Sequence, residues 1–238
     1  TSYYLKEKLY SPNRNTDKND FIYMEMDKAQ GRISTMEKGK IGFQSYPQEG
    51  RQISFKQTEP VLRQISDPER FYPLFTLRRA LEELSAYYCY DTTYSSPVRQ
   101  PAAYSTEKQL MSDGQNLAII LNNIKNSHSF YYEKIEEAVK KINPYFKDIN
   151  FAFLGSKLYL VLREAKLTKS VSIEHISDGT LRYLLLLSIL YNPERGSLVC
   201  IDEPETGLHP DMINTISEAI KHASKNTQLI IATHSPLL

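Results

Sequence analysis

The chain has 238 residues, and its 29 Lys and Arg residues against 28 Asp and Glu residues leave a formal net charge of +1. This balance excludes a global field that would attract nucleic acid or a membrane, so any such binding must be local. The longest apolar stretch, at 183–191, is too short to span a bilayer, and the first residues are no signal peptide. The two cysteines, Cys89 and Cys200, lie in apolar or aromatic segments. These features predict a cytoplasmic protein with reduced thiols and no membrane partner.

The first part of the chain predicts an antiparallel β subdomain over residues 1–57. Short aromatic and β-branched segments such as "FIYMEMD" and "KIGFQSY" alternate there with Gly, Asn, Asp and Pro. From Glu59 onward the pattern changes to helical periodicity. The stretch 72–90 predicts a helix that has Leu74, Leu77, Leu81 and Leu84 on one face.

The middle of the chain predicts a helical insertion over residues 58–147. A loop rich in Ser, Pro and Tyr follows the first helix, and two more helices follow the loop, with a break at 126–129 and an end near Pro144. The remainder, 148–238, predicts an α/β lobe. It opens with two strands that form a hairpin around Gly155, and its last 70 residues alternate helix and strand, as a parallel sheet requires.

Two adjacent carboxylates, Asp202 and Glu203, follow the apolar strand in "LVCIDEPETGLHP", residues 198–210. A strand that is apolar throughout is expected to be covered on both faces. Placing two negative charges at its end is costly unless a cation or a reacting water uses both groups. The alternative is a solvated strand end without chemistry.

A second apolar strand, at 227–233, ends one residue before His234. The residues between the two strands have helical spacing over 210–225, so strand, helix and strand predict a right-handed crossover with parallel strands. Asp202, Glu203 and His234 should then emerge together at the carboxyl ends of the strands, where open α/β sheets bind ligands. A helix-capping histidine is the alternative for His234.

A third element, "HISDGTLRYLLLLSILY", places Ser177, Asp178 and Gly179 just ahead of a helix that is apolar nearly all round. Such a helix is expected to be buried, which leaves its N-terminus free to face a ligand. Exposed backbone N–H groups and a serine hydroxyl form a site that suits phosphate. The alternative is that Ser177 is an ordinary N-cap.

Together, the order and spacing of these elements resemble the second half of an ABC-type ATPase of the branch that includes RecF, SMC-like and OLD-family proteins and many predicted bacterial defence ATPases. "ISDGTLRYL" resembles the signature motif, "LVCIDEPETGLHP" the Walker B strand and D-loop, and "IIATHSP" the switch-histidine motif. The resemblance is specific over 171–238, weaker over 70–150 and only generic over 1–57. It implies an α/β fold with the sheet of a P-loop NTPase.

The resemblance also implies a role for each of the singled-out residues. Asp202 would hold Mg²⁺, Glu203 would orient or deprotonate the attacking water, and His234 would contact the γ-phosphate region. In the signature motif, Ser177 and Gly179 would cap the γ-phosphate of an ATP that a second protomer holds.

The D-loop of the resemblance comprises Gly207, Leu208 and His209, and the motif departs from the commoner ABC pattern at two positions. His209 stands where many ABC proteins carry Asp, and Asp178 replaces a glycine of the commoner signature. Glu205 and His209 are expected to be D-loop surface residues rather than ligands.

One part of an ATPase is missing, because no G-x-x-x-x-G-K-[ST] occurs in the sequence. The chain looks like a piece of a longer protein, and we expect the phosphate cradle upstream of Thr1. A degenerate partner chain is the alternative. In either case this polypeptide should not hydrolyse ATP by itself.

Two functions follow from these observations. The first is an ATP- and Mg²⁺-dependent switch, a head-to-tail homodimer that acts in DNA repair, DNA processing or anti-phage defence, with DNA as a possible partner. The second is the regulatory ATPase part of an OLD-like nuclease or toxin, with an effector domain beyond Leu238. A transporter ATPase fits the helical insertion and the "EPETGLHP" segment poorly.

Overall fold

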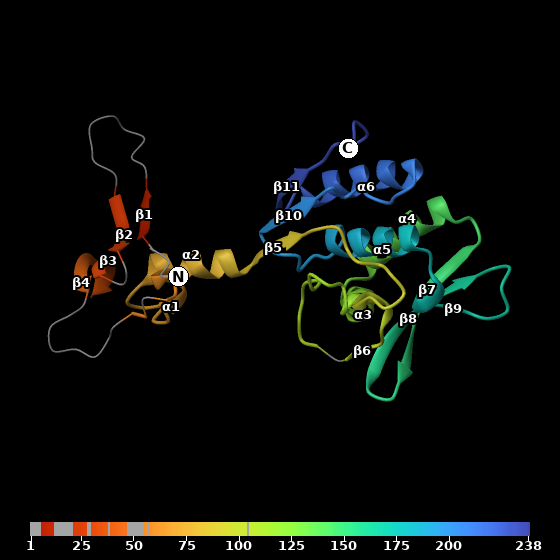
Figure 1. The fold of residues 1–238 in the computed structure, drawn as a ribbon, viewed down its shortest axis with the longest axis horizontal. Coiled ribbons are helices and arrows are strands. Elements are labelled where there is room, and N and C mark those ends of the chain that lie inside the picture. Colours follow the sequence, from red (N-terminus) through yellow and green to blue (C-terminus); the bar gives the residue numbers. More distant parts are fainter. Residues whose placement is uncertain are drawn as a thin grey trace. The chain divides into compact units, whose positions relative to one another are not determined.

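The computed structural model describes residues 6–11, 21–27, 30–37, 39–46, 55–56, 58–103 and 105–238. The chain divides into two compact units, Thr1–Glu82 and Glu83–Leu238 (Figure 1). The division predicted from the sequence, at residues 57 and 147, stays a prediction.

The first unit contains a four-stranded antiparallel meander followed by two helices. The strands are β1 (Lys6–Ser11), β2 (Phe21–Asp27), β3 (Gln30–Glu37) and β4 (Lys40–Tyr46), in the order β1-β2-β3-β4. The helices are α1 (Val61–Gln64) and α2 (Tyr72–Glu82). Their buried residues form one core: Met24, Met26, Ile33, Tyr46, Val61, Ile65, Phe71 and Leu74. The predicted meander is confirmed over the described residues. Of the predicted span 1–57, residues 1–5, 12–20, 28–29, 38, 47–54 and 57 lie outside them.

The helix predicted over 72–90 is wrong from Glu83 onward. Helix α2 ends at Glu82, and Leu84–Tyr87 form the strand β5 of the second unit. Leu74 is buried, but Leu81 is 50% and Leu84 is 37% exposed, so the four leucines do not form one buried face. The segment "LSAYYCY" is rich in tyrosine, which favours strands, and pairing with another strand outweighs the local helical spacing.

The second unit contains a parallel sheet, an antiparallel sheet and the helices packed against them. After β5 the elements are η1 (Pro97–Arg99), β6 (Ala102–Ala103), α3 (Leu117–Ser127), α4 (Ser129–Ile142), β7 (Phe146–Leu154), β8 (Lys157–Glu164), β9 (Val171–Ser172), η2 (Ile173–His175), α5 (Asp178–Leu190), β10 (Leu198–Asp202), α6 (Pro210–Ala223) and β11 (Gln228–Ala232). The predicted break between the two middle helices falls at His128, and β7 and β8 form the predicted hairpin around Gly155.

The parallel sheet has the strand order β11-β10-β5. Strands β10 and β11 pair in parallel, with Val199 opposite Leu229 and Asp202 opposite Ala232, and α6 connects them. The predicted pair of parallel strands joined by a helix is therefore confirmed. Helix α5 is buried along nearly its whole length and shares one core with Val199, Ile201 and α6.

Only one face of this sheet is covered by described helices. Tyr87, Val199 and Ile201 are buried on that face, whereas Leu84 and Ile230 on the other face are 37% and 53% exposed. The expectation that strand 198–201 is covered on both faces is thus wrong for the described part of the chain, because α5 and α6 pack into the same core. No helix in the described ranges is long and apolar enough to cross a membrane.

Candidate active site at the carboxyl edge of the parallel sheet

The predicted convergence of carboxylates and histidine is present at the carboxyl edge of the sheet. Asp202 is the last residue of β10, and the N–H of Glu203 donates to the carbonyl of Ala232 at 2.8 Å, which extends the pairing of β10 and β11 by one residue. His234 follows β11, and its Nε2 lies 3.6 Å from Oε1 of Glu203. Two parallel strands therefore bring a carboxylate and an imidazole within reach of one small ligand.

The backbone of Glu203 is in the left-handed region. Among the described residues, Glu203 is the non-glycine residue with a positive φ, at 45°. This conformation costs a non-glycine residue about 1–2 kcal/mol. The turn that follows holds it there, because the N–H of Thr206 donates to the Glu203 carbonyl at 3.0 Å and its hydroxyl donates to Oε2 at 3.3 Å. Strain of this kind is concentrated at functional sites.

The carboxylates of Asp202 and Glu203 suit a magnesium ion that is also bound by phosphate oxygens. Both side chains are exposed, and carboxylate oxygens are the donors that Mg²⁺ prefers. No cluster of three or more His, Cys, Asp or Glu that could enclose a metal occurs in the described part of the chain. Mg²⁺ suits this arrangement, because it is commonly held by one or two carboxylates and completes its shell with water and phosphate oxygens.

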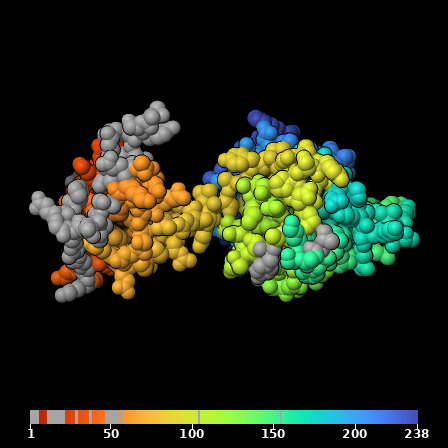
Figure 2. All heavy atoms as spheres, turned by 60° about the horizontal axis from the view of Figure 1, so that its bottom comes forward, coloured from red at the N-terminus to blue at the C-terminus, as the bar shows by residue number. Residues whose placement is uncertain are grey.

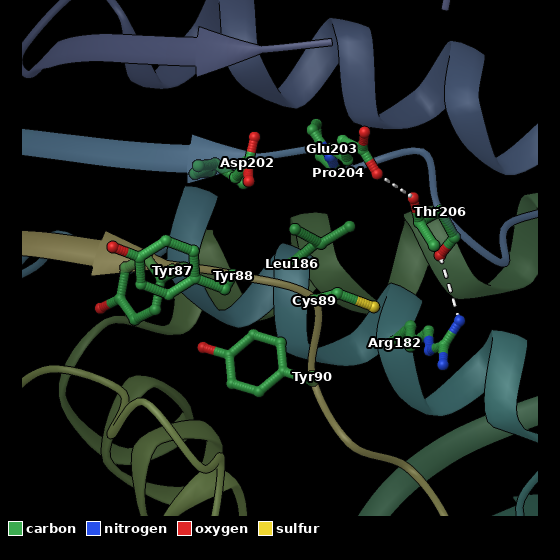
Figure 3. Close-up of a pocket in the computed structure, with 11 residues that line it drawn as sticks. Tyr87, Tyr88, Cys89, Tyr90, Arg182, Leu186, Asp202, Glu203, Pro204 and Thr206 are labelled. Carbon is green, nitrogen blue, oxygen red and sulfur yellow. Dashed lines mark hydrogen bonds between the residues drawn. The ribbon is translucent and has the colours of Figure 1, made fainter. Parts of the chain in front are cut away.

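Beside the two carboxylates lies a small pocket, one side of which is formed by the end of β5 (Figure 3). Tyr87, Tyr88, Cys89 and Tyr90 line it together with Arg182 of α5. These tyrosines were not among the site residues predicted from the sequence, because the spacing over 72–90 predicts a helix. The run of tyrosines in 84–90, a residue type that favours strands, is the sequence signal that points away from a helix there.

The chain that follows β5 runs as a loop over the surface of the second unit, in the yellow region of Figure 2. Its residue Arg99 is nonetheless buried, with only 4% of its surface exposed. The Arg99 guanidinium donates to the carbonyls of Thr92, Ile173, Glu174 and Ile176 at 2.8–3.2 Å. It therefore fixes the chain that leads into α5, and no sequence pattern indicated this role.

At the start of α5, Ser177 is the N-cap, and its Oγ accepts from the N–H of Thr180 at 3.3 Å. The N-cap alternative for Ser177 is therefore present in the structure, and an N-cap is compatible with an anion site at the same helix end. Asp178 pairs with Arg99 at 2.6 Å, and Gly179 lies so close to the next motif that an added Cβ would stand 3.2 Å from the Gly207 carbonyl oxygen.

The predicted D-loop connects α5 to the carboxylates. Gly207 has a φ of 75°, and an added Cβ would collide with the guanidinium of Arg182. Arg182 also donates to the carbonyl of Thr206 at 3.4 Å (Figure 3). Leu208 packs against the core, and His209 is the N-cap of α6, where its Nδ1 accepts from the Asp211 N–H at 3.3 Å.

Glu205 of the predicted D-loop binds other parts of the chain through its carboxylate. It is half-buried, and its Oε1 accepts from the Thr233 hydroxyl at 2.7 Å and from the N–H groups of His234 and Ser235 at 2.9 and 3.0 Å. Burial raises the pKa of this carboxyl, but the hydrogen bonds outweigh burial and hold the pKa below its usual value. The D-loop thus binds the loop that carries His234 through the Glu205 carboxylate.

Comparison with known proteins assigns the chain to a family. The family model described as "AAA domain, putative AbiEii toxin, Type IV TA system" matches residues 47–238, well over half of the chain. The chain therefore belongs to this family of AAA-type ATPases. The assignment confirms the resemblance to ABC-type ATPases of the RecF and SMC branch and the α/β fold of a P-loop NTPase.

Two curated relatives are similar to part of the chain. "Retron Ec83 probable ATPase" from Escherichia coli is 29% identical over 147 residues, which are 55% of this chain and 26% of that protein. "Retron Vc95 probable ATPase" from Vibrio cholerae serotype O1 biovar El Tor is 28% identical over 131 residues, which are 49% of this chain and 26% of that protein. The chain thus matches about a quarter of the length of these relatives.

Solved structures of SMC head domains are more distant. An Smc head domain from Pyrococcus furiosus, bound to the C-terminal domain of ScpA, is 17% identical with a TM-score of 0.39 and covers 49% of this chain and 31% of that one. An SmcHead bound to the C-winged helix domain of ScpA is 13% identical with a TM-score of 0.45 and covers 84% and 58%. These scores are too low to support an argument, so the assignment rests on the family match.

Proposed function

We propose that the protein containing this chain binds and hydrolyses ATP as a molecular switch of the RecF, SMC and OLD type, in which ATP brings two copies together head to tail. The observation that carries the proposal is the convergence of Asp202, Glu203 and His234 at one edge of the sheet, with 3.6 Å between Glu203 Oε1 and His234 Nε2. The strained backbone of Glu203 supports a catalytic role for this carboxylate.

Each of the three residues has a distinct task in this proposal. Glu203 orients the attacking water and accepts its proton, as a general base within hydrogen-bond reach can do. His234 donates a hydrogen bond to an oxygen of the transferred phosphoryl group. Asp202 holds Mg²⁺, which when bound neutralises charge on the β and γ phosphates.

The start of α5 supplies the second half of a composite site. Ser177 and the backbone N–H of Gly179 lie at the N-terminus of a 13-residue helix, where the helix dipole attracts anions. We place the γ-phosphate of an ATP held by a second copy there. Asp178 would repel it, but the pairing of Asp178 with the buried Arg99 offsets that charge locally.

We expect the phosphate cradle to come from outside these 238 residues. The sequence contains no G-x-x-x-x-G-K-[ST], and the curated relatives extend far beyond the matched part. Strand β11 is an edge strand of the described sheet, and the outer backbone groups of an edge strand suit the pairing of another strand. We therefore expect calorimetry to detect negligible ATP binding by this chain alone and Mg²⁺-dependent binding by the full-length protein.

A second function is favoured by the family description, which names a toxin of a type IV toxin–antitoxin system. In that case the ATPase regulates an effector, a nuclease or another toxin domain, that lies elsewhere in the full-length protein or in a partner. DNA repair or DNA processing belongs to the first function, and growth arrest on expression belongs to the second. Expressing the full-length protein and its Glu203→Gln variant in bacteria, with growth as the readout, separates the two.

The activity itself is tested by two isosteric variants of the full-length protein. Glu203→Gln keeps the shape of the side chain and removes the base, so ATP turnover should fall about 10²–10⁴-fold while ATP binding is kept. The dimer should then accumulate in size-exclusion chromatography with ATP and Mg²⁺. Asp202→Asn should weaken Mg²⁺-dependent binding along with turnover, so no dimer should accumulate.

Turnover of the Glu203→Gln variant at the parent rate would contradict the proposal. The adjacent carboxylates would then be a solvated strand end. A normal Mg²⁺ dependence of ATP binding in Asp202→Asn would remove only the assignment of the metal ligand.

A further inference from the structure

Glu205 does not line the pocket beside the reacting groups, yet its carboxylate binds the loop that carries His234. Its Oε1 accepts hydrogen bonds from the Thr233 hydroxyl and from two successive backbone N–H groups, those of His234 and Ser235. Its Oε2 is buried and has no hydrogen-bond partner in the described part of the chain. Glu205 therefore binds the loop after β11 through one carboxylate oxygen, Oε1.

A carboxylate suits this position because the loop presents three hydrogen-bond donors to it. Successive N–H groups that point the same way form a concave site for an anion, and hydrogen bonds to a charged acceptor are roughly twice as strong as those between neutral groups. The Thr233 hydroxyl also accepts from the Ser235 N–H at 3.0 Å, so it completes the turn around Glu205.

The backbone matters here because the side chain of His234 is not held by packing. It is 91% exposed, and its described polar contact is the 3.6 Å approach to Glu203. The position of the imidazole therefore follows from the position of the loop. Since Glu205 fixes that loop, Glu205 sets how far His234 stands from Glu203.

The same short segment also reaches the other two motifs. Thr206, the next residue, donates to Glu203 through its hydroxyl and accepts from Arg182 of α5 through its carbonyl. A displacement of the D-loop would thus move the base, the start of α5 and the loop of His234 together.

We propose that Glu205 is a positioning residue that holds the His234 loop at its working distance from Glu203 and couples that loop to the D-loop. This inference rests on the proposed ATPase function. It assigns to Glu205 no contact with the phosphate or the water, only the placement of a residue that makes one.

Hydrogen exchange and kinetics on the full-length protein test the proposal. Glu205→Ala removes the acceptor, so exchange of the amides of His234 and Ser235 should become at least about tenfold faster. Turnover should fall about 10–100-fold, with KM changed less than about threefold, because misplacement by about 1 Å impairs the reaction more than binding. Glu205→Gln keeps the accepting oxygen without the charge, and its turnover should stay within about fivefold of the parent.

The matched control is Glu218→Ala on α6, which removes an exposed glutamate paired with Lys141 and should change neither exchange at 234–235 nor turnover. Unchanged amide exchange at His234 and Ser235 in Glu205→Ala would contradict the inference that Glu205 holds this loop. Faster exchange with an unchanged kcat would overturn the positioning role. If the parent protein does not hydrolyse ATP, both the proposed function and the positioning role of Glu205 are wrong. The exchange rates of the His234 and Ser235 amides still test whether Glu205 holds the loop.

Discussion

Two segments that flank the candidate site are each held by one charged side chain, and the two charges are opposite. The chain leading into α5 presents carbonyl oxygens, and the cation Arg99 binds them. The loop after β11 presents N–H groups, and the anion Glu205 binds them. In each case one side chain holds a short segment beside the site, and the charge of the side chain matches the backbone groups that it binds.

The two side chains differ in burial. Arg99 is 4% exposed, whereas Glu205 is only half-buried and keeps one oxygen without a described partner. A buried charge that satisfies several carbonyls contributes mainly to stability, because its removal leaves those groups unpaired away from water. A half-buried side chain such as Glu205 can release its partners at a smaller cost in free energy. We therefore expect the α5 side to be rigid and the His234 side to be adjustable.

The largest effect should come from Arg99→Ala. The variant leaves the carbonyls of Thr92 and Ile176 without their donor in a buried environment, so the free energy of unfolding should fall by about 3–5 kcal/mol. Urea unfolding measures it, and Arg79→Ala on an exposed part of α2 serves as the control. A loss in the free energy of unfolding below about 1 kcal/mol would contradict the expectation that the α5 side is held more rigidly than the His234 side.

A smaller effect is expected for Gly207→Ala, which tests the connection between the segments. Its φ of 75° disfavours alanine by about 1–2 kcal/mol, and the new methyl group also displaces Arg182. Gly155→Ala is the matched control, because Gly155 has a φ of 60° with open space around the new Cβ. Thermal unfolding should show a larger loss for Gly207→Ala than for Gly155→Ala. Equal losses would mean that the contact with Arg182 contributes nothing.

Acid should weaken the hold of Glu205 on the loop that carries His234. The folded-state pKa of Glu205 lies below its usual value, so its contribution to stability is fully present above the unfolded-state pKa of about 4.3 and is lost as the pH falls through the folded-state pKa. The difference in unfolding free energy between the parent and Glu205→Gln should therefore shrink as the pH is lowered from 7 to 3. A difference that stays constant over this range would show that the charge of Glu205 is not what holds the loop.

The smallest effect is expected for Asp178→Asn. The side chain of Asp178 is 65% exposed, and solvent-exposed ion pairs contribute about 0–1 kcal/mol. Arg99 keeps its carbonyl partners in this variant, so urea unfolding should hardly change. A loss as large as that of Arg99→Ala would mean that the ion pair, and not the set of carbonyls, fixes the start of α5.

The site residues predicted from the sequence are those whose positions follow from local patterns. The apolar strand before Asp202, the helical spacing over 210–225 and the second apolar strand predict one crossover, and a crossover has one common edge. The roles of Arg99 and Glu205 could not be predicted in this way. Arg99 binds residues more than 70 positions away and Glu205 binds residues 28–30 positions away, and no periodicity records such contacts. The strand β5 was missed because its neighbour β10 lies more than 100 residues away.

The left-handed backbone of Glu203 has a consequence for how variants of this protein would respond to selection. At this position the backbone favours glycine or asparagine, whereas the proposed chemistry needs a carboxylate. A library randomised at position 203 and sorted for resistance to proteolysis should enrich glycine and asparagine. The same library sorted for ATP turnover should return glutamate. Selection for resistance to proteolysis and selection for activity would therefore favour different residues at position 203.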